Sequence, residues 1–399
     1  MKDTVVITGM GAVSCLGRGL HGFWSGLVDG RSGIGPVRKF DASGIRNPEA
    51  GEVHDWPRES LPEWAMEFDE ACQFALVAAK EAVEHAQLGA ASMPDTGIVL
   101  ATNFGGARTF EQWAPVPVAD RQPDLFHKSL PPAATNAMAA FLGASGPRTT
   151  LSLSCSSGAA AIGVAADWIR RGRAQRIIAG GYDALSLYAL AGLSCLRTVT
   201  TGKLQPFDKN RSGTVFGEGA GMLVLENLES AIERGVRPLA VLSGWAINNN
   251  AHHLTAPDTR GQGTLQAMRG ACHDAGRTPD DIDYVNAHGT GTRYNDPAET
   301  AALHEFLGDR AMLVPVSSIK ASISHTMGGA GALEAIATIL SIETGIVPPT
   351  LNWQERDPDC DLDYVPNEAR RHPVQCALSL SSGIGGNNAA LFLESARQR

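Results

Sequence analysis

Several features common in other classes of protein are missing from this sequence. Its cysteines number seven, an odd count, and none forms a C-x-x-C spacing, which argues against a disulfide framework and against a zinc ribbon. No apolar run approaches the roughly 20 residues of a membrane span, and the run at the N-terminus is too short for a signal peptide. We therefore expect a protein of the reducing cytoplasm without a membrane partner.

Positive charge is also scarce. The chain has 33 Lys and Arg residues against 42 Asp and Glu residues, which gives a formal net charge of −9. A protein that binds nucleic acid needs a basic surface to contact the phosphates. We therefore expect no nucleic-acid partner and only local basic patches.

Short motifs of well-known chemistry are absent as well. The sequence holds no P-loop, no H-E-x-x-H zinc motif and no G-x-S-x-G nucleophile elbow. Gly9-Met10-Gly11 follows an apolar run as a dinucleotide-binding loop would, but Ser14 stands where that loop needs its third glycine. The adjacent His252 and His253 have no carboxylate at a metal-binding spacing. We predict no cofactor and no metal.

What is present indicates a folded α/β protein. The chain has 399 residues, of which 43% are hydrophobic, and it exceeds the length of one domain of about 150 residues. Strands are predicted over 4–8, 97–101, 149–153, 176–179, 221–226, 239–244, 283–286, 313–317, 376–381 and 389–394, and helices over 71–86, 159–170, 264–275, 298–306 and 331–342. The proline-rich stretch 109–132 is predicted to be irregular. Alternating strands and helices favour buried sheets covered by helices.

The two halves of the chain repeat one pattern. Residues 216–226 align without gaps on residues 384–394, and each segment is a glycine loop that leads into an apolar strand ending at Glu. A chance match is the alternative, because glycine loops are common turns. We predict a duplicated unit that divides into residues 1–235 and 236–399.

Cys155 has the context of a nucleophile. It follows a predicted strand and precedes Ser156-Ser157-Gly158, where an alanine-rich helix begins. A thiol at a helix N-terminus lies near unpaired N–H groups, which are expected to lower its pKa and to bind an oxyanion. Cys72 and Cys272 lie on apolar helix faces, where a packed thiol is the ordinary explanation. A buried small residue is the alternative for Cys155 too.

Two histidines follow predicted strands in the second half, His288 and His325. Loops after strands are where α/β proteins place their sites, although a lone histidine there is more often structural. A thiolate could accept an acyl group as a thioester. Two neutral imidazoles could then stabilise the enolate that forms when a malonyl thioester loses carbon dioxide. Lys320, with Glu299 as its ion-pair partner, is expected to balance the charge.

The motifs around these residues stand in one order along the chain. They are Ser154-Cys155-Ser156-Ser157-Gly158, residues 206–213 leading to residues 217–221, residues 286–292 with Asp296 and Glu299, and Lys320 five residues before His325. With them, nearly the whole chain resembles the β-ketoacyl-acyl-carrier-protein synthases of the elongating Cys-His-His type. The resemblance implies a thiolase-like α/β fold of five αβαβα layers with two duplicated halves. It also implies a homodimer, or a heterodimer with a ketosynthase-like subunit, whose interface lies near the nucleophile.

The resemblance also implies roles for individual residues. The catalytic set is Cys155, His288, His325, Lys320 and Glu299, and the substrate-binding set is Thr290, Thr292, Ile384, Phe104, Ser382 and Gly385. Thr290 and Thr292 match hydroxyls that hold the phosphopantetheine arm of an acyl carrier protein, which delivers the acyl and malonyl substrates. The N–H groups of Cys155 and Ile384 match an oxyanion hole. Some relatives hold a structural cation near the positions of Asn286 and Glu334.

The sequence departs from the family pattern around the expected acyl site. Residues 381–386 lack both aromatic rings of the usual loop, and Ile384 stands where an aromatic side chain gates the pocket. Phe104 falls where smaller aliphatic residues often line the acyl pocket, while Ser154 and Ser324 replace the usual Ala and Gly. These changes predict a specialised substrate, short, unsaturated or conjugated, in a fatty-acid-like or specialised polyene or polyketide pathway.

Carrier proteins are acidic, so docking needs a local basic patch. Two clusters are candidates: Arg170, Arg171, Arg173 and Arg176, and Lys203, Lys209 and Arg211. Residues 63–70, often basic in relatives, are acidic here. An ordinary solvated surface is the alternative for most of these arginines.

Two other functions are weighed against this one. A coenzyme-A-dependent thiolase would carry a second catalytic cysteine in a C-terminal C-x-G loop, and residues 382–386 contain none. A non-catalytic, chain-length-determining partner subunit typically lacks the nucleophile, whereas Cys155 and both histidines are present here. The acyl chain, the cognate carrier and the kind of dimer stay open.

Overall fold

The computed structural model describes residues 4–256 and 258–398. Its main element is a ten-stranded sheet in the order β10-β9-β13-β14-β8-β1-β7-β6-β4-β5. The strands are β1 (Val5–Val13), β4 (Thr96–Ala101), β5 (Arg148–Leu151), β6 (Arg176–Asp183), β7 (Gly219–Asn227), β8 (Ala240–Asn249), β9 (Tyr284–Asn286), β10 (Val316–Ser317), β13 (Cys376–Gly383) and β14 (Asn387–Ser395). The pairs β2 (Gly35–Pro36) with β3 (Glu49–Ala50) and β11 (Ile346–Val347) with β12 (Arg370–Arg371) lie outside it.

The sheet is symmetric about its centre, where β1 and β8 pair antiparallel. Outward from this pair run β1-β7-β6-β4-β5 on one side and β8-β14-β13-β9-β10 on the other. In each half the first two pairings are antiparallel and the next two are parallel. The gapless alignment of the two halves pairs the first residue of β7 with that of β14, and one more residue in the same register reaches the last residue of each strand. The predicted duplication is therefore confirmed.

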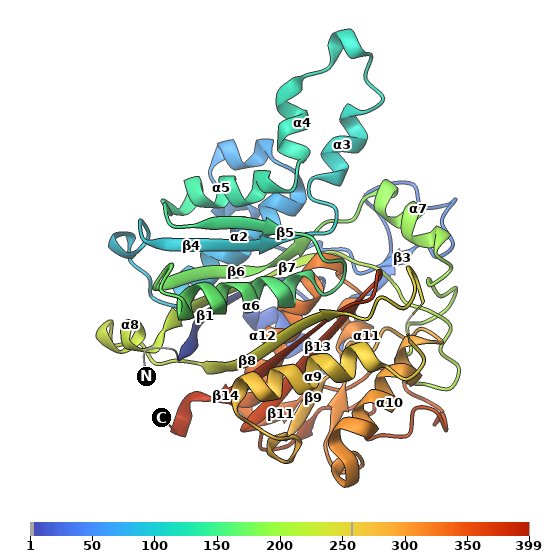
Figure 1. Ribbon diagram of the computed structural model, residues 1–399. Helices are drawn as coiled ribbons and strands as arrows, with labels where there is room; N and C mark the ends of the chain where they lie inside the picture. The colour runs from blue at the N-terminus through green and yellow to red at the C-terminus, as the bar shows by residue number, and fades with distance from the viewer. Residues whose placement is uncertain (1–3, 257, 399) are drawn as a thin grey trace.

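Helices complete the layers (Figure 1). They are α1 (Gly19–Val28), α2 (Glu70–His85), α3 (Ala107–Trp113), α4 (Pro123–Ser129), α5 (Pro132–Leu142), α6 (Ser157–Arg170), α7 (Leu187–Cys195), α8 (Leu228–Glu233), α9 (Gln262–Ala275), α10 (Asn295–Leu307), α11 (Lys320–Ile323) and α12 (Ala330–Thr344). The helices α6 and α12 contact each other and strands of both halves, while α2 and α5 cover one outer face and α9 and α10 the other. Each half of the ten-stranded sheet thus lies between an outer helix layer and the central layer of α6 and α12, which gives the predicted five-layered αβαβα arrangement.

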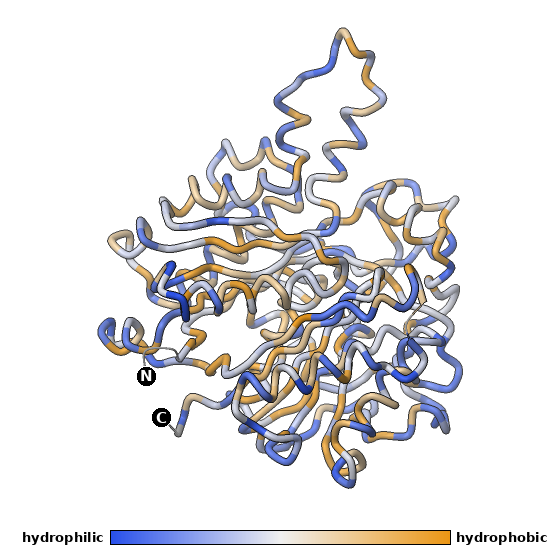
Figure 2. The backbone as a smooth tube through the Cα atoms, viewed as in Figure 1, coloured by the Kyte–Doolittle hydropathy of each residue, from blue (hydrophilic) through white to orange (hydrophobic). Residues whose placement is uncertain are grey.

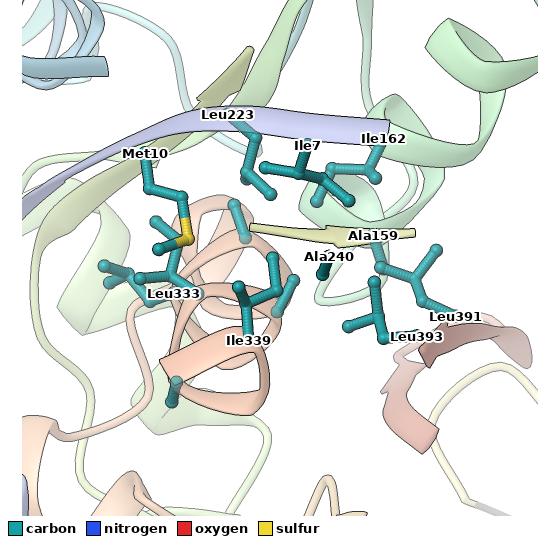
Figure 3. Close-up of a cluster of buried hydrophobic side chains, with 14 of the residues drawn as sticks. Ile7, Met10, Ala159, Ile162, Leu223, Ala240, Leu333, Ile339, Leu391 and Leu393 are labelled. Atoms are coloured by element: carbon teal, nitrogen blue, oxygen red, sulfur yellow. The ribbon is translucent and has the colours of Figure 1, made fainter. Parts of the chain in front are cut away.

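The central layer explains why α6 and α12 are rich in small residues. A Cβ atom on Gly158 would lie 2.8 Å from the backbone N of Ala332, and one on Gly331 would lie 2.7 Å from that of Ala159. The glycines thus let the two helices approach closely. Around them, side chains from both halves form one buried apolar cluster (Figure 3), and hydrophobic residues follow the central strands along the chain (Figure 2).

Two local predictions were wrong. The stretch 109–132 is not irregular, because it contains most of α3 and all of α4, which project from the body (Figure 1). Pro123 and Pro132 are the first residues of α4 and α5, a position that suits proline because the first N–H groups of a helix have no intrahelical partner. The strand predicted over 313–317 shrinks to β10, since Leu313 and Val314 hydrogen-bond back to Arg310 in a turn. Every helix of the described part of the chain falls short of what a bilayer span requires.

Candidate active site

Cys155 lies in the turn between β5 and α6, as the sequence predicts. The residue before it, Ser154, has a φ of 53°, in the left-handed region. Two hydrogen bonds fix the turn: Ser156 Oγ donates to the Leu153 carbonyl at 2.7 Å, and the Leu153 N–H donates to Ser157 Oγ at 2.7 Å. The thiol is therefore held rigidly, two residues before the helix begins.

The protonation state of Cys155 differs from the prediction. Burial raises the pKa of its thiol from 9.0 to about 11, although the Lys320 charge and the N–H of Ile384 act in the opposite direction. The predicted lowering of this pKa is therefore wrong for the free protein. The physical reason is that burial destabilises the thiolate by more free energy than the nearby positive groups stabilise it. Cys155 is a thiol at neutral pH.

Both predicted histidines meet Cys155 in one cleft. The rings of His288 and His325 are 5.4 Å apart between centroids and stand at 86° to each other. His288 follows β9 and His325 follows α11, and both side chains are buried. Burial, and then the charge of Lys320, hold the pKa of each ring well below 6.5. Both imidazoles are therefore neutral at pH 7.

Fixed donors decide which ring nitrogen carries the proton. The Lys320 ammonium lies 3.3 Å from His288 Nδ1, and the N–H of Met327 lies 3.2 Å from His325 Nδ1. An ammonium and a backbone N–H can only donate, so each Nδ1 accepts. The proton of each neutral ring is then on Nε2. The Nδ1 contact holds each ring in place. The Nε2–H group of each histidine is therefore free to donate to another atom.

The predicted ion pair of Lys320 with Glu299 is wrong. Lys320 instead pairs with Glu334, a buried residue of α12, and donates to the His288 carbonyl at 2.5 Å. Glu299 accepts the N–H groups of His288 and Gly289 at 2.7 and 2.9 Å. The packing of α12 beside the site, which sequence spacing does not reveal, decides the partner. Glu299 thus shapes the histidine loop, and burial raises its pKa to about 7.

The cleft has an empty volume of about 830 Å³, its open mouth included. Of the predicted residues, it is lined by Cys155, His288, Thr290, Thr292, Glu299, His325, Ser382, Ile384 and Gly385. The hydroxyls of Thr290 and Thr292 are 3.0 Å apart. A Cβ atom on Gly383 would lie 3.1 Å from the Cys155 nitrogen, so glycine lets this loop approach Cys155.

Phe104 is the exception among the predicted substrate-binding residues. It is half-buried in a hydrophobic cluster with Phe216 and Met327, and it is not among the residues that line the cleft. Its N–H donates to Asp183 at 3.0 Å. Phe104 therefore backs the cleft wall in this chain, and its contact with an acyl chain stays a prediction.

Sequence reasoning missed several residues of the cleft. Phe216 stacks on the His325 ring, with centroids 5.4 Å apart, and Thr198, Thr214 and the loop that includes Asn250 and His253 form the remaining walls. The available signal was weak: the polar run after β8 indicated a loop at the strand ends, where sites occur. No group of three or more metal-ligating side chains occurs in the described residues.

A buried thiol and two neutral imidazoles inside a duplicated αβαβα fold define a thiolase-fold condensing enzyme of the acyltransferase class. The chain belongs to the β-ketoacyl synthase family. The family model "Beta-ketoacyl synthase, N-terminal domain" matches residues 2–231, and "Beta-ketoacyl synthase, C-terminal domain" matches residues 239–354. The resemblance predicted from the motifs is confirmed.

Similarity to individual proteins extends over nearly the whole chain. The 3-oxoacyl-[acyl-carrier-protein] synthase 2 of Synechocystis sp. is 37% identical, over 98% of this chain and 97% of that protein. The tetracenomycin polyketide synthase ketoacyl synthase alpha subunit of Streptomyces glaucescens is 39% identical, over 98% and 97%. The solved structure of the ishigamide ketosynthase/chain length factor superposes with a TM-score of 0.93 at 35% identity, over 99% and 100%. The similar proteins thus include a 3-oxoacyl-[acyl-carrier-protein] synthase, a ketoacyl synthase subunit of a polyketide synthase and a ketosynthase/chain length factor.

Proposed function

We propose that this protein is a β-ketoacyl-acyl-carrier-protein synthase that condenses an acyl group on Cys155 with a malonyl group on a carrier protein. The observation that carries the proposal is the meeting of one thiol and two neutral imidazoles, His288 and His325, in a single cleft. Because both Nδ1 atoms already accept hydrogen bonds, both Nε2–H groups are available to a substrate oxygen.

The reaction has two stages. In the first, Cys155 Sγ attacks the acyl thioester, the bond to the carrier sulfur breaks, and the thiol proton ends on the released carrier arm. In the second, the malonyl unit loses its carboxylate as carbon dioxide, and the electron pair forms an enolate whose oxygen accepts the Nε2–H groups of His288 and His325. The enolate carbon then attacks the acyl–Cys155 carbonyl. The N–H groups of Cys155 and Ile384 stabilise that oxyanion before the C–S bond breaks. Cys155 leaves as a thiolate, which takes up one proton from water to restore the thiol.

Acyl carrier protein is the partner in this proposal, as the names of the relatives suggest. Thr290 and Thr292 in the cleft supply hydroxyls for its phosphopantetheine arm. Of the two basic clusters, the one at Lys203, Lys209 and Arg211 is favoured for docking by its position alone, because the buried Arg211 donates from Nε to the Thr292 carbonyl at 3.3 Å, beside the cleft.

The other basic cluster, at residues 170–176, lies at the end of α6 opposite Cys155. Its Arg170 pairs with Asp274, and its Arg171 pairs with Asp167. Its distance from the cleft makes this cluster the poorer docking surface, because Lys209 and Arg211 of the other cluster are ion-paired as well.

The remaining parts of the proposal concern organisation and location. We place the chain in a homodimer, or in a heterodimer with a ketosynthase-like subunit, and divide it into halves of residues 1–235 and 236–399. A cytoplasmic location agrees with the absence of disulfides, since all seven cysteines are free.

The test separates loading from condensation. Cys155→Ala should abolish the acyl adduct that intact mass spectrometry detects after incubation with acyl carrier protein thioesters. His288→Ala and His325→Ala should keep the adduct and block product formation. Cys195→Ala, which alters an exposed cysteine outside the cleft, is the matched control and should keep both. A wild-type chain that takes no adduct would instead favour the chain-length-determining partner subunit.

A panel of acyl carriers tests the specialised substrate. With Ile384 in place of an aromatic gate, we propose that short, unsaturated or conjugated acyl groups load faster than long saturated ones. Ile384→Phe should shift the preference toward the family's usual substrates, read as the ratio of adducts in a competition experiment. A wild-type preference for long saturated chains would contradict the proposal.

A further inference from the structure

Two threonine hydroxyls in the wall of the cleft have no hydrogen-bond partner among the described residues. They belong to Thr198 and Thr214, two residues that line the cleft, and both hydroxyl oxygens are buried in the free protein, so each side chain must turn about its Cα–Cβ bond to present the hydroxyl to a ligand. Other buried hydroxyls without a partner, such as those of Ser243, Thr326 and Ser379, lie on residues that do not line the cleft. A buried polar group is normally hydrogen-bonded, so an orphan in a binding cleft indicates a partner that arrives with the ligand.

The backbone holds these threonines beside the catalytic histidine. The Thr214 N–H donates to the Thr198 carbonyl at 2.7 Å, and the Thr214 carbonyl accepts the N–H of Thr200 at 3.0 Å. The main-chain groups of Thr214 therefore have hydrogen-bond partners, and its hydroxyl is the one polar group of this residue without a partner among the described residues. The next residue, Val215, accepts the N–H of His325 at 2.8 Å. The pair of threonines is thus fixed to the segment that positions His325.

Alternation along this extended segment separates two faces. Val215 packs in an apolar cluster with Leu204, Ala321 and Leu351, whereas Thr214 and Phe216, one residue to either side, line the cleft. Phe216 stacks on the His325 ring. The Thr214 side chain therefore belongs to the same wall as the ring that faces the substrate. Valine would fill this position with the same shape and without an unpaired hydroxyl.

We propose that Thr198 and Thr214 form a polar subsite that donates hydrogen bonds to an oxygen atom of the bound thioester substrate other than the thioester oxygen. This inference rests on the proposed function and deepens it, because the two Nε2–H groups already serve the thioester oxygen. The oxygen belongs either to the carboxylate of the malonyl unit or to an oxygen substituent on the acyl chain. In both cases the subsite selects an oxygenated substrate over an apolar one.

The variants are Thr198→Val, Thr214→Val and the double variant, each of which removes a hydroxyl and keeps the shape. Thr214→Ser keeps the hydroxyl. Thr200→Val is the matched control, because the Thr200 hydroxyl bonds Ser212 Oγ at 2.6 Å in the same pair of segments but lies outside the cleft. Thermal unfolding of each variant checks that it folds. If Thr214→Val does not fold, the comparison is made between Thr198→Val and Thr214→Ser.

Two measurements distinguish the sources of the oxygen. The first is kcat/KM for malonyl carrier protein with a saturated acyl group already on Cys155. The second is the ratio of 3-hydroxyacyl to saturated acyl adducts of equal length on Cys155. We expect the double variant to lower one of them about tenfold, as losing a hydrogen bond to a substrate oxygen does, while Thr214→Ser stays within about twofold of wild type. A drop in kcat/KM for malonyl carrier protein would show that the subsite binds the malonyl carboxylate. A drop in the ratio of 3-hydroxyacyl to saturated adducts would show that it binds an oxygen substituent on the acyl chain.

The inference is overturned if both quantities stay within about twofold of wild type in the double variant. It is also overturned if Thr200→Val causes the same loss, because the effect would then come from the local fold. Failure of the proposed function has a different signature: wild-type protein would take no acyl group at Cys155 at all.

Discussion

At the scale of single residues, burial sets the protonation state of the site. Desolvation raises the pKa of the Cys155 thiol and lowers the pKa of both histidine rings. The site therefore holds a thiol and two neutral imidazoles at neutral pH, although a cationic Lys320 lies beside them. Neutral rings can donate from Nε2 to a developing enolate without first losing a proton.

The reactivity of Cys155 toward alkylation should follow its raised pKa. Only the thiolate reacts, and with a pKa of about 11 the thiolate fraction rises about tenfold per pH unit between pH 7 and pH 10. The rate of Cys155 modification by iodoacetamide, measured by peptide mass spectrometry, should rise accordingly. Modification of the exposed Cys195 in the same sample serves as the control for the activity of the reagent. A rate that levels off near pH 7 would show a stabilised thiolate instead.

Ser324 is strained for a residue with a side chain. Its φ of 66° and ψ of −177° fall in a region that is essentially reserved for glycine. Ser324→Gly should therefore stabilise the protein by about 1 kcal/mol, after the greater freedom of glycine in the unfolded chain is subtracted. Urea unfolding measures this difference. A loss of stability would mean that the serine side chain contributes packing that outweighs the strain.

At the scale of elements, strand ends and helix starts bring Cys155, His288 and His325 together in the cleft. A buried carboxylate at the end of β6, Asp183, links two of these loops. It accepts hydrogen bonds from Thr102 Oγ1 at 2.6 Å and from the Phe104 N–H at 3.0 Å after β4, and from the Gly328 N–H at 2.7 Å in the short helix Met327–Gly329. Asp183 thereby positions the segment whose Met327 N–H holds His325.

Asp183→Asn should impair condensation more than loading. An amide has one accepting oxygen, so it loses part of this set of hydrogen bonds, and each buried donor left unpaired is costly. We expect kcat for condensation to fall about tenfold or more, a loss of about 1.4 kcal/mol in transition-state stabilisation. The rate of acyl adduct formation on Cys155 should change much less. Equal losses in both steps would mean that Asp183 maintains the fold rather than the histidine.

At the scale of the whole molecule, the first half holds one apolar cluster of its own, but the largest cluster is shared between the halves. The largest apolar cluster joins Ile7, Ile162 and Leu223 of the first half to Leu333 and Leu391 of the second (Figure 3). The helices α6 and α12 pack on each other in its middle. A half alone would expose this face to water.

Residues 1–235 expressed alone should therefore fail to unfold cooperatively. Without α12 and β14, the side of α6 that packs against them has no cover, and hydrophobic burial is the main source of stability. Near-ultraviolet circular dichroism and urea unfolding should show a loosely packed chain. Co-expression with residues 236–399 should restore a cooperative transition. Independent cooperative unfolding of the first half would contradict this view.

Local patterns predicted most elements but not every boundary. Apolar periodicity places α2, α6, α9 and α12 within a few residues, because these helices are long and bury a wide face. It misses α3 and α4, whose prolines suggested a loop although Pro123 starts a helix. It extends β10 too far, because apolar Leu313 is exposed in a turn.

The sequence alone predicted the fold class, the duplication, and the three residues Cys155, His288 and His325 that the structure brings together in one cleft, since each prediction depends on a local motif or on periodicity along the chain. The tertiary structure alone decided that Lys320 pairs with Glu334, that the Cys155 thiol stays protonated, and that Thr198 and Thr214 reach the cleft. The physical reason is that ion pairing, desolvation and cleft walls depend on which segments pack together across the molecule, and spacing along the chain does not encode that.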